Sequence, residues 1–472
     1  MKAQLKFICN KEIISGEFNP AMTVLDFLRN MKELKGTKEG CREGDCGACT
    51  VLVGELSGNY VNYKNINSCL LPMGDIDGKH VISIEGLNIE GVNLFQQFLV
   101  DEGGTQCGFC TPGFVVSFTS YLLTAETFET EKAIDYLTGN LCRCTGHPGI
   151  IRAAQDVIKI LNKKEVFTDR ITFLIENKLI PEYFKVAASK LKQMQKPRTH
   201  INYEGTKLIV SGGTDLYVQQ GDVIAGKDIN LISELINAEI IKIQNDECIV
   251  SASATVADLE TSSIFNNMFK GFKDIAELFG SKQIRNRATI GGNINNASPI
   301  GDMTAFFLSL NAKLILSGKS QTREVFLKDY YKGYKQLDRQ VDEVVSRILF
   351  KIPSGNSKYS FEKVCRRKYL DIASVNTSFY CEVADNKFSV VHISAGGVGP
   401  IPTYLSKMAE TLNGKEINYD NIKQSIESAL TEITPISDVR GSVEYKKLLL
   451  RNLLYAHFMK LFPEVISEEV VL

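Results

Sequence analysis

The stretch Cys41-Arg-Glu-Gly-Asp-Cys46-Gly-Ala-Cys49 places three cysteines in a Cys-x4-Cys-x2-Cys pattern, and Cys69 follows twenty residues later. A second group lies downstream, where Cys107-x2-Cys110 is followed by Cys142-x-Cys144. Eight of the chain's twelve cysteines therefore fall in two groups before residue 145. Outside an oxidising compartment, thiols at such short spacing are more often metal ligands than disulfide partners.

The first group has the spacing of a plant-type ferredoxin loop, which supplies three of the four thiolates of an iron–sulfur cluster. Gly44 and Gly47 let the backbone curl so that amide N–H groups can point at the sulfurs. The alternatives are incidental thiols or a zinc site, but zinc sites usually pair two Cys-x2–4-Cys knuckles. We expect an iron–sulfur cluster held by Cys41, Cys46, Cys49 and Cys69.

The second group consists of two half-sites, and each leads into the start of an expected helix. Pro112 and Pro148 suit first-turn positions there, and a helix N-terminus favours the negative charge of a thiolate-bound cluster. A Cys-x-Cys pair is too close for a relaxed disulfide and is uncommon for zinc. We expect a second cluster held by Cys107, Cys110, Cys142 and Cys144.

The bulk composition is that of a soluble globular chain with about three domains. Of its 472 residues, 44% are hydrophobic and 23% charged, and the formal net charge is −1. No global basic field attracts nucleic acid or an anionic membrane, and no apolar run approaches the roughly 20 residues that span a bilayer. The N-terminal residues alternate like a strand and lack a signal-peptide core. We expect a cytoplasmic protein with no nucleic-acid or membrane partner.

The first 162 residues predict a small mixed α+β unit followed by a helical one. A β-hairpin is expected over 2–8 and 11–18, a helix from Thr23 to near Lys35–Gly36, and short strands near 50–55, 60–63 and 81–84. Four amphipathic helices are expected over 93–102, 112–123, 130–137 and 148–162.

The rest of the chain begins with a Lys-rich, weakly patterned segment, 164–200, that we interpret as a surface linker. Strands and helices alternate beyond it: strand 207–210, helices 258–265 and 273–279, strands 313–316, 346–352, 378–383 and 388–394, and a helical tail, 444–461.

Two glycine-rich stretches are candidate ligand-binding segments. Leu208–Leu216, LIVSGGTDL, is an apolar strand that runs into two glycines, where backbone N–H groups can approach phosphate oxygens. A Gly-Gly turn after a strand is often purely structural, and G-x-G-x-x-G is absent. Arg285–Asp302, RNRATIGGNINNASPIGD, is too polar for a core strand and suits a backbone that winds around a polar ligand.

The cysteine motifs resemble a known family. Gln106–Gly113, QCGFCTPG, and Gly139–Gly146, GNLCRCTG, are similar to the second iron–sulfur domain of molybdenum hydroxylases, the family of xanthine dehydrogenase and aldehyde oxidase. The resemblance implies that both clusters are 2Fe–2S, and that Gln106 faces a molybdopterin. His147-Pro148 stands where many relatives have Tyr-Arg-Pro, which leaves the ligands intact.

The resemblance covers essentially the whole chain and implies a multidomain α+β fold. The expected order is a β-grasp 2Fe–2S ferredoxin-like domain (1–88), a four-helix 2Fe–2S domain (89–163), the linker, a non-Rossmann α+β FAD-binding domain (201–353) and a C-terminal α+β flavoprotein domain (354–472).

The resemblance also implies FAD-binding residues. The pyrophosphate is expected against Ile209, Val210, Ser211, Gly212, Gly213, Thr214, Asp215 and Leu216. Other parts of FAD are expected against Phe279, Thr289 and Asp302, with Gly292, Asn293 and Ser298 in the same loop. A family lysine beside the flavin falls at Glu362 or Lys363, of which we favour Lys363. Asp371 matches a carboxylate on the loop beside the nicotinamide site, although Arg366, Arg367 and Lys368 also fit a solvated basic patch.

The function implied is that of the small subunit of a split, bacterial-type enzyme, most simply a xanthine dehydrogenase that converts xanthine or hypoxanthine to urate. Electrons would pass from a molybdopterin centre on a large partner subunit, in a heterotetramer of two copies each, through two 2Fe–2S clusters to FAD and then NAD+. Aldehyde, nicotinate or CO oxidation by the partner is an alternative. A flavin-free iron–sulfur adaptor is an alternative of another class.

Overall fold

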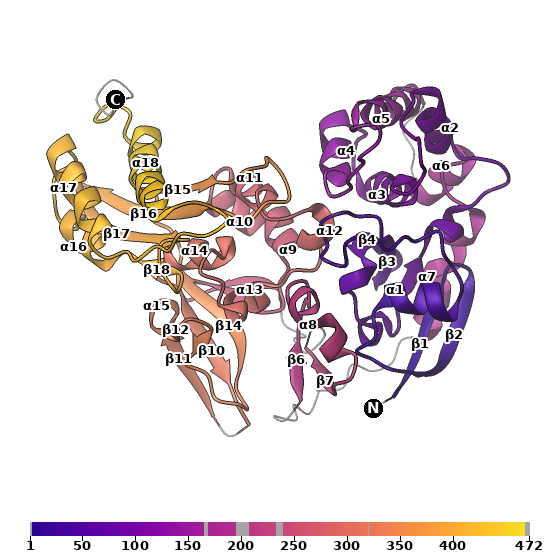
Figure 1. Ribbon diagram of the computed structural model, residues 1–472, viewed down its shortest axis with the longest axis horizontal. Coiled ribbons are helices and arrows are strands. Elements are labelled where there is room, and N and C mark those ends of the chain that lie inside the picture. Colours follow the sequence, from indigo (N-terminus) through magenta and orange to yellow (C-terminus); the bar gives the residue numbers. More distant parts are fainter. Residues whose placement is uncertain (1, 165–168, 195–206, 233–238, 320, 468–472) are drawn as a thin grey trace. The chain divides into compact units, whose positions relative to one another are not determined.

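The computed structural model describes residues 2–164, 169–194, 207–232, 239–319 and 321–467. These residues divide into two units (Figure 1). One unit comprises 2–194, 207–232 and 280–288, and the other comprises 239–279 and 289–467. Within the described ranges no helix is long and apolar enough to cross a membrane.

The first unit contains a five-stranded sheet in the order β2-β1-β5-β3-β4. Its strands are β1 (Ala3–Cys9), β2 (Glu12–Phe18), β3 (Thr50–Ser57), β4 (Tyr60–Asn67) and β5 (His80–Ile82). β1 and β5 run parallel, and the other neighbours are antiparallel. The predicted hairpin and strands are thus confirmed.

The apolar residues of a short helix share a core cluster with residues of this sheet. The helix consists of α1 (Val24–Asp26) and a π-helical turn, η1 (Phe27–Met31), and the Thr23 hydroxyl caps the backbone N–H of Asp26 at 3.2 Å. Phe27 packs edge-on against Phe7, with ring centroids 5.4 Å apart. The prediction that the helix reaches residues 35–36 is wrong, because Glu33 adopts a left-handed conformation with φ of 55°.

Four helices follow the sheet: α2 (Leu94–Asp101), α3 (Thr111–Thr124), α4 (Thr130–Leu137) and α5 (Pro148–Leu161). They confirm the four predicted helices, and both prolines occupy first-turn positions. Helix α3 packs on β3 and β4 as well as on α4, while α2 packs on α5. The helices and sheet therefore share one apolar core.

The segment interpreted as a linker has more structure than its weak pattern predicts. Its described part contains α6 (Arg170–Glu176), the 3-10 helix η5 (Glu182–Val186) and α7 (Ala187–Met194). Phe173, Leu174 and Phe184 are buried in the core of the four helices. Residues 165–168 and 195–200 lie outside the described residues.

The first unit also includes a strand–helix–strand element, β6 (Leu208–Val210), α8 (Leu216–Ile224) and β7 (Ile229–Leu231), together with the short helix α12 (Lys282–Arg285). β6 and β7 pair in parallel, as a crossover through α8 requires. The predicted strand at 207–210 is therefore confirmed.

The second unit contains a five-stranded antiparallel sheet in the order β11-β10-β14-β9-β8. Its strands are β8 (Ile241–Gln244), β9 (Glu247–Ser251), β10 (Lys313–Ser317), β11 (Thr322–Phe326) and β14 (Val344–Lys351). The helices of this region are α9 (Val256–Thr261), α10 (Ser263–Met268), α11 (Phe272–Glu277), α13 (Ile290–Asn296), α14 (Asp302–Leu308) and α15 (Leu327–Tyr330). A small hairpin, β12 (Tyr331–Gly333) and β13 (Gln336–Leu337), follows α15.

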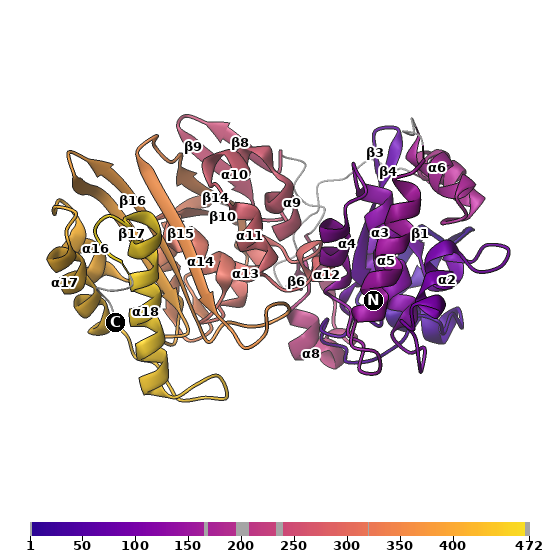
Figure 2. The same cartoon turned by 90° about the horizontal axis from the view of Figure 1, so that it is seen from above.

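A four-stranded antiparallel sheet completes the second unit: β15 (Ser357–Val364), β16 (Val375–Ala384), β17 (Lys387–Gly396) and β18 (Thr403–Tyr404). The helices around it are α16 (Ser406–Leu412), α17 (Tyr419–Leu430) and α18 (Val443–Leu461). Helix α18 contacts β15 and β16, and Figure 2 shows it running beside these strands. Helix α14 contacts β16 and β17. The predicted helical tail and the predicted strands at 378–383 and 388–394 are confirmed, whereas β15 and β18 were not predicted.

Candidate iron–sulfur and flavin sites

The first cysteine group lies where the loop after η1 meets β3 and the turn after β4. Cys49 and Cys69 are buried, and their sulfurs are 3.3 Å apart. The backbone N–H of Glu43 donates to the Cys41 sulfur at 3.3 Å. The contact between the Cys41 and Cys46 thiols lowers the pKa of Cys41 and raises that of Cys46, and the N–H of Glu43 also favours the Cys41 thiolate. The loop thus offers amide donors of the kind that an anionic cluster requires.

The second cysteine group joins the starts of α3 and α5. The sulfurs of Cys107 and Cys144 are 3.5 Å apart, and both residues are exposed. Burial raises the pKa of Cys142, but the Thr145 hydroxyl at 3.1 Å and the Thr145 N–H at 3.3 Å outweigh it, so that pKa falls to about 7. Both predicted groups are brought together, and their donor sets fit 2Fe–2S clusters.

Two hydrogen bonds join the cysteine loops directly. The N–H of Leu141 donates to the carbonyl oxygen of Cys46 at 3.0 Å, and Asn140 Nδ2 donates to the Gly47 carbonyl at 2.9 Å. Gly47 has a φ of +67°, and a Cβ there would collide with the Gly139 carbonyl. Only glycine permits so close an approach, so residues 46–47 and 139–141 form one rigid junction.

Gln283, on α12, completes this junction, and sequence reasoning missed it. Its side chain is fully buried, and Nε2 donates to Asn140 Oδ1 at 3.0 Å and to Ser117 Oγ at 3.2 Å. Ser117 Oγ in turn donates to Asn140 Oδ1 at 2.7 Å. Nothing in the local sequence indicates that a glutamine in a four-residue helix contacts Asn140, which lies 143 positions earlier in the chain.

The residues after Gln283 correct one expectation. Arg285 pairs with Asp135 at 2.8 Å, and Arg287 forms a buried ion pair with Asp75. Both arginines therefore serve contacts within the first unit, while residues from 289 onward belong to the second. The sequence 285–302 is not one ligand-winding loop.

The candidate pyrophosphate loop lies between β6 and α8 in the first unit. Gly213 has a φ of +73°, and Asp215 is the N-cap residue of α8. Arg287 Nη2 donates to the Ser211 carbonyl at 3.2 Å and so fixes the turn. A strand, two glycines and a helix N-terminus form a recurrent phosphate-binding arrangement, so residues 209–216 fit this part of FAD.

The same element packs against the first cysteine group. Val210, Tyr217 and Ile224 share a small apolar cluster with Cys49 and Cys69. The Tyr217 hydroxyl also donates to the Ala21 carbonyl at 2.9 Å. The candidate phosphate loop and the first cluster site are thus neighbours within one unit.

In the second unit, Thr289 starts a helix rather than an irregular loop. Its hydroxyl accepts the Gly292 N–H at 3.1 Å and caps α13. Asn293 lies on this helix, and its Oδ1 accepts the N–H and the hydroxyl of Thr304, each at 3.1 Å. Ser298 follows Ala297, which ends the helix in a left-handed conformation. The expectation of a winding backbone therefore holds only for residues 297–301.

Asp302 and Lys363 form a buried pair. Lys363 and its neighbour Glu362 therefore point to opposite sides of β15. Lys363 Nζ lies 2.7 Å from Asp302 Oδ2 and donates to the Leu278 carbonyl, next to Phe279, at 2.8 Å. Asn376 Nδ2 donates to Asp302 Oδ1 at 2.5 Å. Glu362 faces the other way, with Oε1 3.2 Å from Lys460 Nζ.

Asp371 lies on a separate turn. It accepts the backbone N–H groups of Arg367 at 2.8 Å and of Ile372 at 3.0 Å. Burial raises its pKa, but these donors prevail and the net shift is downward. Asp371 is therefore a charged group that fixes the turn after β15.

Comparison with known families accounts for most of the chain. A 2Fe-2S iron-sulfur cluster binding domain matches residues 9–73, and a [2Fe-2S] binding domain matches 83–155. An FAD binding domain in molybdopterin dehydrogenase matches 182–354, and a CO dehydrogenase flavoprotein C-terminal domain matches 360–461. The chain belongs to the molybdenum hydroxylase family.

Curated relatives agree along nearly the whole chain. Xanthine dehydrogenase of Emericella nidulans is 27% identical over 87% of this chain, and xanthine dehydrogenase 1 of Arabidopsis thaliana is 27% identical over 93%. The matched regions are 35% and 38% of those proteins, so the chain spans under two fifths of the length of these relatives.

Two solved structures share the fold. Carbon monoxide dehydrogenase of Hydrogenophaga pseudoflava has 21% identity and a TM-score of 0.50, covering 52% of this chain and 86% of that chain. Quinoline 2-oxidoreductase of Pseudomonas putida 86 has 20% identity and a TM-score of 0.50, covering 56% and 92%. Over these matched regions, about half of this chain, they agree with the predicted α+β fold.

Proposed function

We propose that this chain is the electron-transfer subunit of a molybdenum hydroxylase. In this role it receives electrons from a molybdopterin centre on a partner subunit and delivers them through two 2Fe–2S clusters and FAD to NAD+. Clusters change by one electron and nicotinamide by two, and a flavin does either. The observation that carries the proposal is the order of the two cysteine groups and the candidate pyrophosphate loop within the first unit.

That order runs from the surface inward. Cys107 and Cys144 are exposed and are flanked by the exposed apolar side chains of Phe109 (46%) and Leu141 (45%). Cys49 and Cys69 are only 2% and 4% exposed and share an apolar cluster with β6 and α8. The second cysteine group is thus accessible, and the first is buried beside the candidate pyrophosphate loop. This arrangement suits a chain that conducts electrons from a partner subunit to FAD.

The protein's own residues would hold the groups and set their surroundings. The cluster ligands are Cys41, Cys46, Cys49, Cys69, Cys107, Cys110, Cys142 and Cys144. The residues proposed for FAD are Ile209–Leu216, Phe279, Thr289, Gly292, Asn293, Ser298, Asp302 and Lys363. The buried Lys363–Asp302 pair places a fixed cation at the end of β15, where it would orient a flavin rather than react with it.

The substrate of the partner is proposed to be xanthine or hypoxanthine, because the curated relatives described above are xanthine dehydrogenases. We propose a heterotetramer of two copies of each subunit in the cytoplasm. The complex co-purified with its partner should oxidise hypoxanthine and xanthine with formation of NADH. Activity on aldehydes, nicotinate or CO alone would overturn the purine assignment.

The two ligand sets are tested separately by substitution. In the reduced protein, Cys144→Ser should remove one of two distinguishable cluster EPR signals and leave the other, because different elements build the two sites. Cys41→Ser is the matched variant and should remove the other signal. Survival of both signals in Cys144→Ser would show that the second set is misassigned.

A further inference from the structure

Arg287 is a buried arginine that joins the candidate pyrophosphate loop to a turn that follows Cys69. Its side chain is 8% exposed and forms an ion pair with Asp75, which is 1% exposed. Arg287 Nη2 also donates to the Ser211 carbonyl at 3.2 Å. One guanidinium group therefore contacts both the sheet domain of the first cysteine group and the loop 209–216.

The turn that carries Asp75 also packs against the strand–helix–strand element. Asp75 lies in a 3-10 helix, η3 (Met73–Ile76), six residues after Cys69. A Cβ added at Gly74 would collide with the Leu231 side chain on β7. The ion pair thus forms at a place where η3 and this element already approach each other closely.

The segment that carries Arg287 is held by its other side chains. Asn286 Nδ2 donates to the backbone carbonyl of Asn65 on β4 at 3.0 Å and to its side-chain oxygen at 2.9 Å. Arg285 pairs with Asp135 on α4 at 2.8 Å. The guanidinium group of Arg287 therefore extends from a backbone that is fixed to two further elements of the first unit.

The pair of Arg287 and Asp75 is a poor source of stability. Removing two charges from water offsets most of their attraction, and apolar residues of similar size often replace such a pair without loss of stability. Arg287 Nε is also buried and has no acceptor among the described residues, which adds a further cost. The consequence of the pair is therefore positional: it holds the Ser211 carbonyl in one place.

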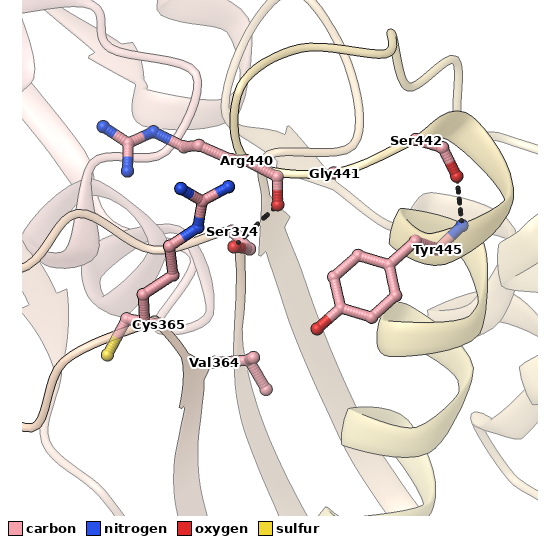
Figure 3. A pocket seen from close by; sticks show the side chains of 8 residues that line it. Val364, Cys365, Ser374, Arg440, Gly441, Ser442 and Tyr445 are labelled. Carbon is pink, nitrogen blue, oxygen red and sulfur yellow. Dashed lines mark hydrogen bonds between the residues drawn. The ribbon is translucent and has the colours of Figure 1, made fainter.

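The arginines at the surface of the second unit are arranged differently. Arg366 and Arg440 line a pocket of about 360 Å³ where β15 ends and α18 begins, and Figure 3 shows Arg440 there. Arg366 is exposed, the backbone N–H of Arg440 donates to Asp438 Oδ1 at 2.8 Å, and Glu444 lies in the first turn of α18. Solvent and these carboxylates offset the charges at this pocket, whereas Arg287 is shielded from solvent.

We propose that Arg287 is a positioning residue for FAD, an inference that rests on the proposed function. Together with Asp75 it holds the loop 209–216 in the conformation that receives the pyrophosphate. A loop that is ordered beforehand loses less conformational entropy when its ligand binds. The affinity for FAD should therefore depend on this ion pair more strongly than the stability of the first unit does.

The experiment replaces both members of the pair, Asp75→Leu with Arg287→Met, because removing one member would leave the other charge buried and unpaired. FAD is titrated into the purified full chain, which retains its clusters but has been freed of flavin, and binding is followed by flavin fluorescence. We expect the Kd for FAD to rise about tenfold or more. The urea midpoint for the loss of cluster absorbance, which reports unfolding of the first unit, should be unchanged or higher.

Two further variants show whether the effect belongs to Arg287. Asp135→Leu with Arg285→Met is the matched control, because it removes an ion pair from the same segment, and its Kd for FAD should stay within about twofold of the wild type. Arg287→Lys with Asp75 intact should recover part of the affinity, since an ammonium group still pairs with the carboxylate.

The outcomes separate this inference from the proposed function. If the wild type binds FAD and the variant at positions 75 and 287 binds it equally tightly, the positioning role is overturned and the proposed function stands. A urea midpoint that falls together with the affinity, or an equal loss of affinity in the control, also overturns the positioning role, because the effect is then a general loss of structure. A wild-type chain that binds no FAD refutes both.

Discussion

At the scale of the residue, Gln283 shows how one buried amide joins distant parts of the chain. It contacts Ser117 and Asn140, and Asn140 reaches the Gly47 carbonyl in the other cysteine loop. The side chains of Gln283, Ser117 and Asn140 thus fix the two cysteine loops relative to each other. Their hydrogen bonds act on the backbone beside Cys46 and Cys142 rather than on the sulfurs themselves.

Gln283→Ala should lower the free energy of unfolding of the first unit by about 1–3 kcal/mol, because Asn140 loses a buried donor and a void remains. It should also broaden the EPR signals of both clusters, since the loops that hold them lose a common anchor. Urea unfolding and EPR of the reduced protein measure these effects. Gln97→Ala is the control, because Gln97 is exposed and its side chain donates to Asp101 on its own helix. Unchanged stability and spectra in Gln283→Ala would contradict this role.

At the scale of the element, α18 is fixed to its sheet by an apolar face that contains a neutral histidine. His457 is fully buried, Nε2 lies 2.8 Å from Thr377 Oγ1 on β16, and Nδ1 has no partner among the described residues. Burial lowers its pKa from 6.5 to about 3. Protonation of His457 therefore opposes the packing of α18.

Acidification should weaken the second unit through this histidine. Between pH 6.5 and 3 the unfolded chain binds a proton that the folded chain does not, so stability falls as pH falls. From pH 7 to pH 5 the loss from His457 is about 2 kcal/mol. Urea unfolding at both pH values measures it, and His457→Gln should lose less over the same interval by that amount. An equal loss in both proteins would refute this assignment.

The elements also show what the sequence could predict. Residues 93–162 combine apolar periodicity with prolines at helix starts, and α2 to α5 follow the prediction closely. Helix α13 was missed because its Asn-rich sequence lacks an apolar face, and its capping Thr289 becomes evident only in three dimensions. The cysteine groups were predictable because their spacing is local. Gln283 and Asn376 were not, because their partners are far away in the sequence.

At the scale of the whole molecule, the chain combines separately built sites. The cysteine groups and the loop 209–216 belong to one unit, while Thr289, Asp302 and Lys363 belong to the other. The matched families describe 2Fe–2S and FAD domains in the same order along the chain.

The purified chain should contain about four iron atoms, two for each 2Fe–2S cluster, and one FAD. Iron analysis and the absorbance of extracted flavin measure this ratio. Iron without flavin would favour the iron–sulfur adaptor and refute the proposed route to NAD+. When the protein is refolded without iron, the free energy of unfolding should fall more for the first unit than for the second. The reason is that both ligand sets lie in the first unit.

The exposure of Cys107 and Cys144 has a consequence for how such a chain survives in air. Thiolates that solvent reaches are the first that peroxide and oxygen reach, and their oxidation beyond the sulfenic state is largely irreversible. Cys49 and Cys69 are shielded by the surrounding side chains. Oxidative damage would therefore start at the outer site, and a covering protein surface would act there as a shield as well as an electron donor.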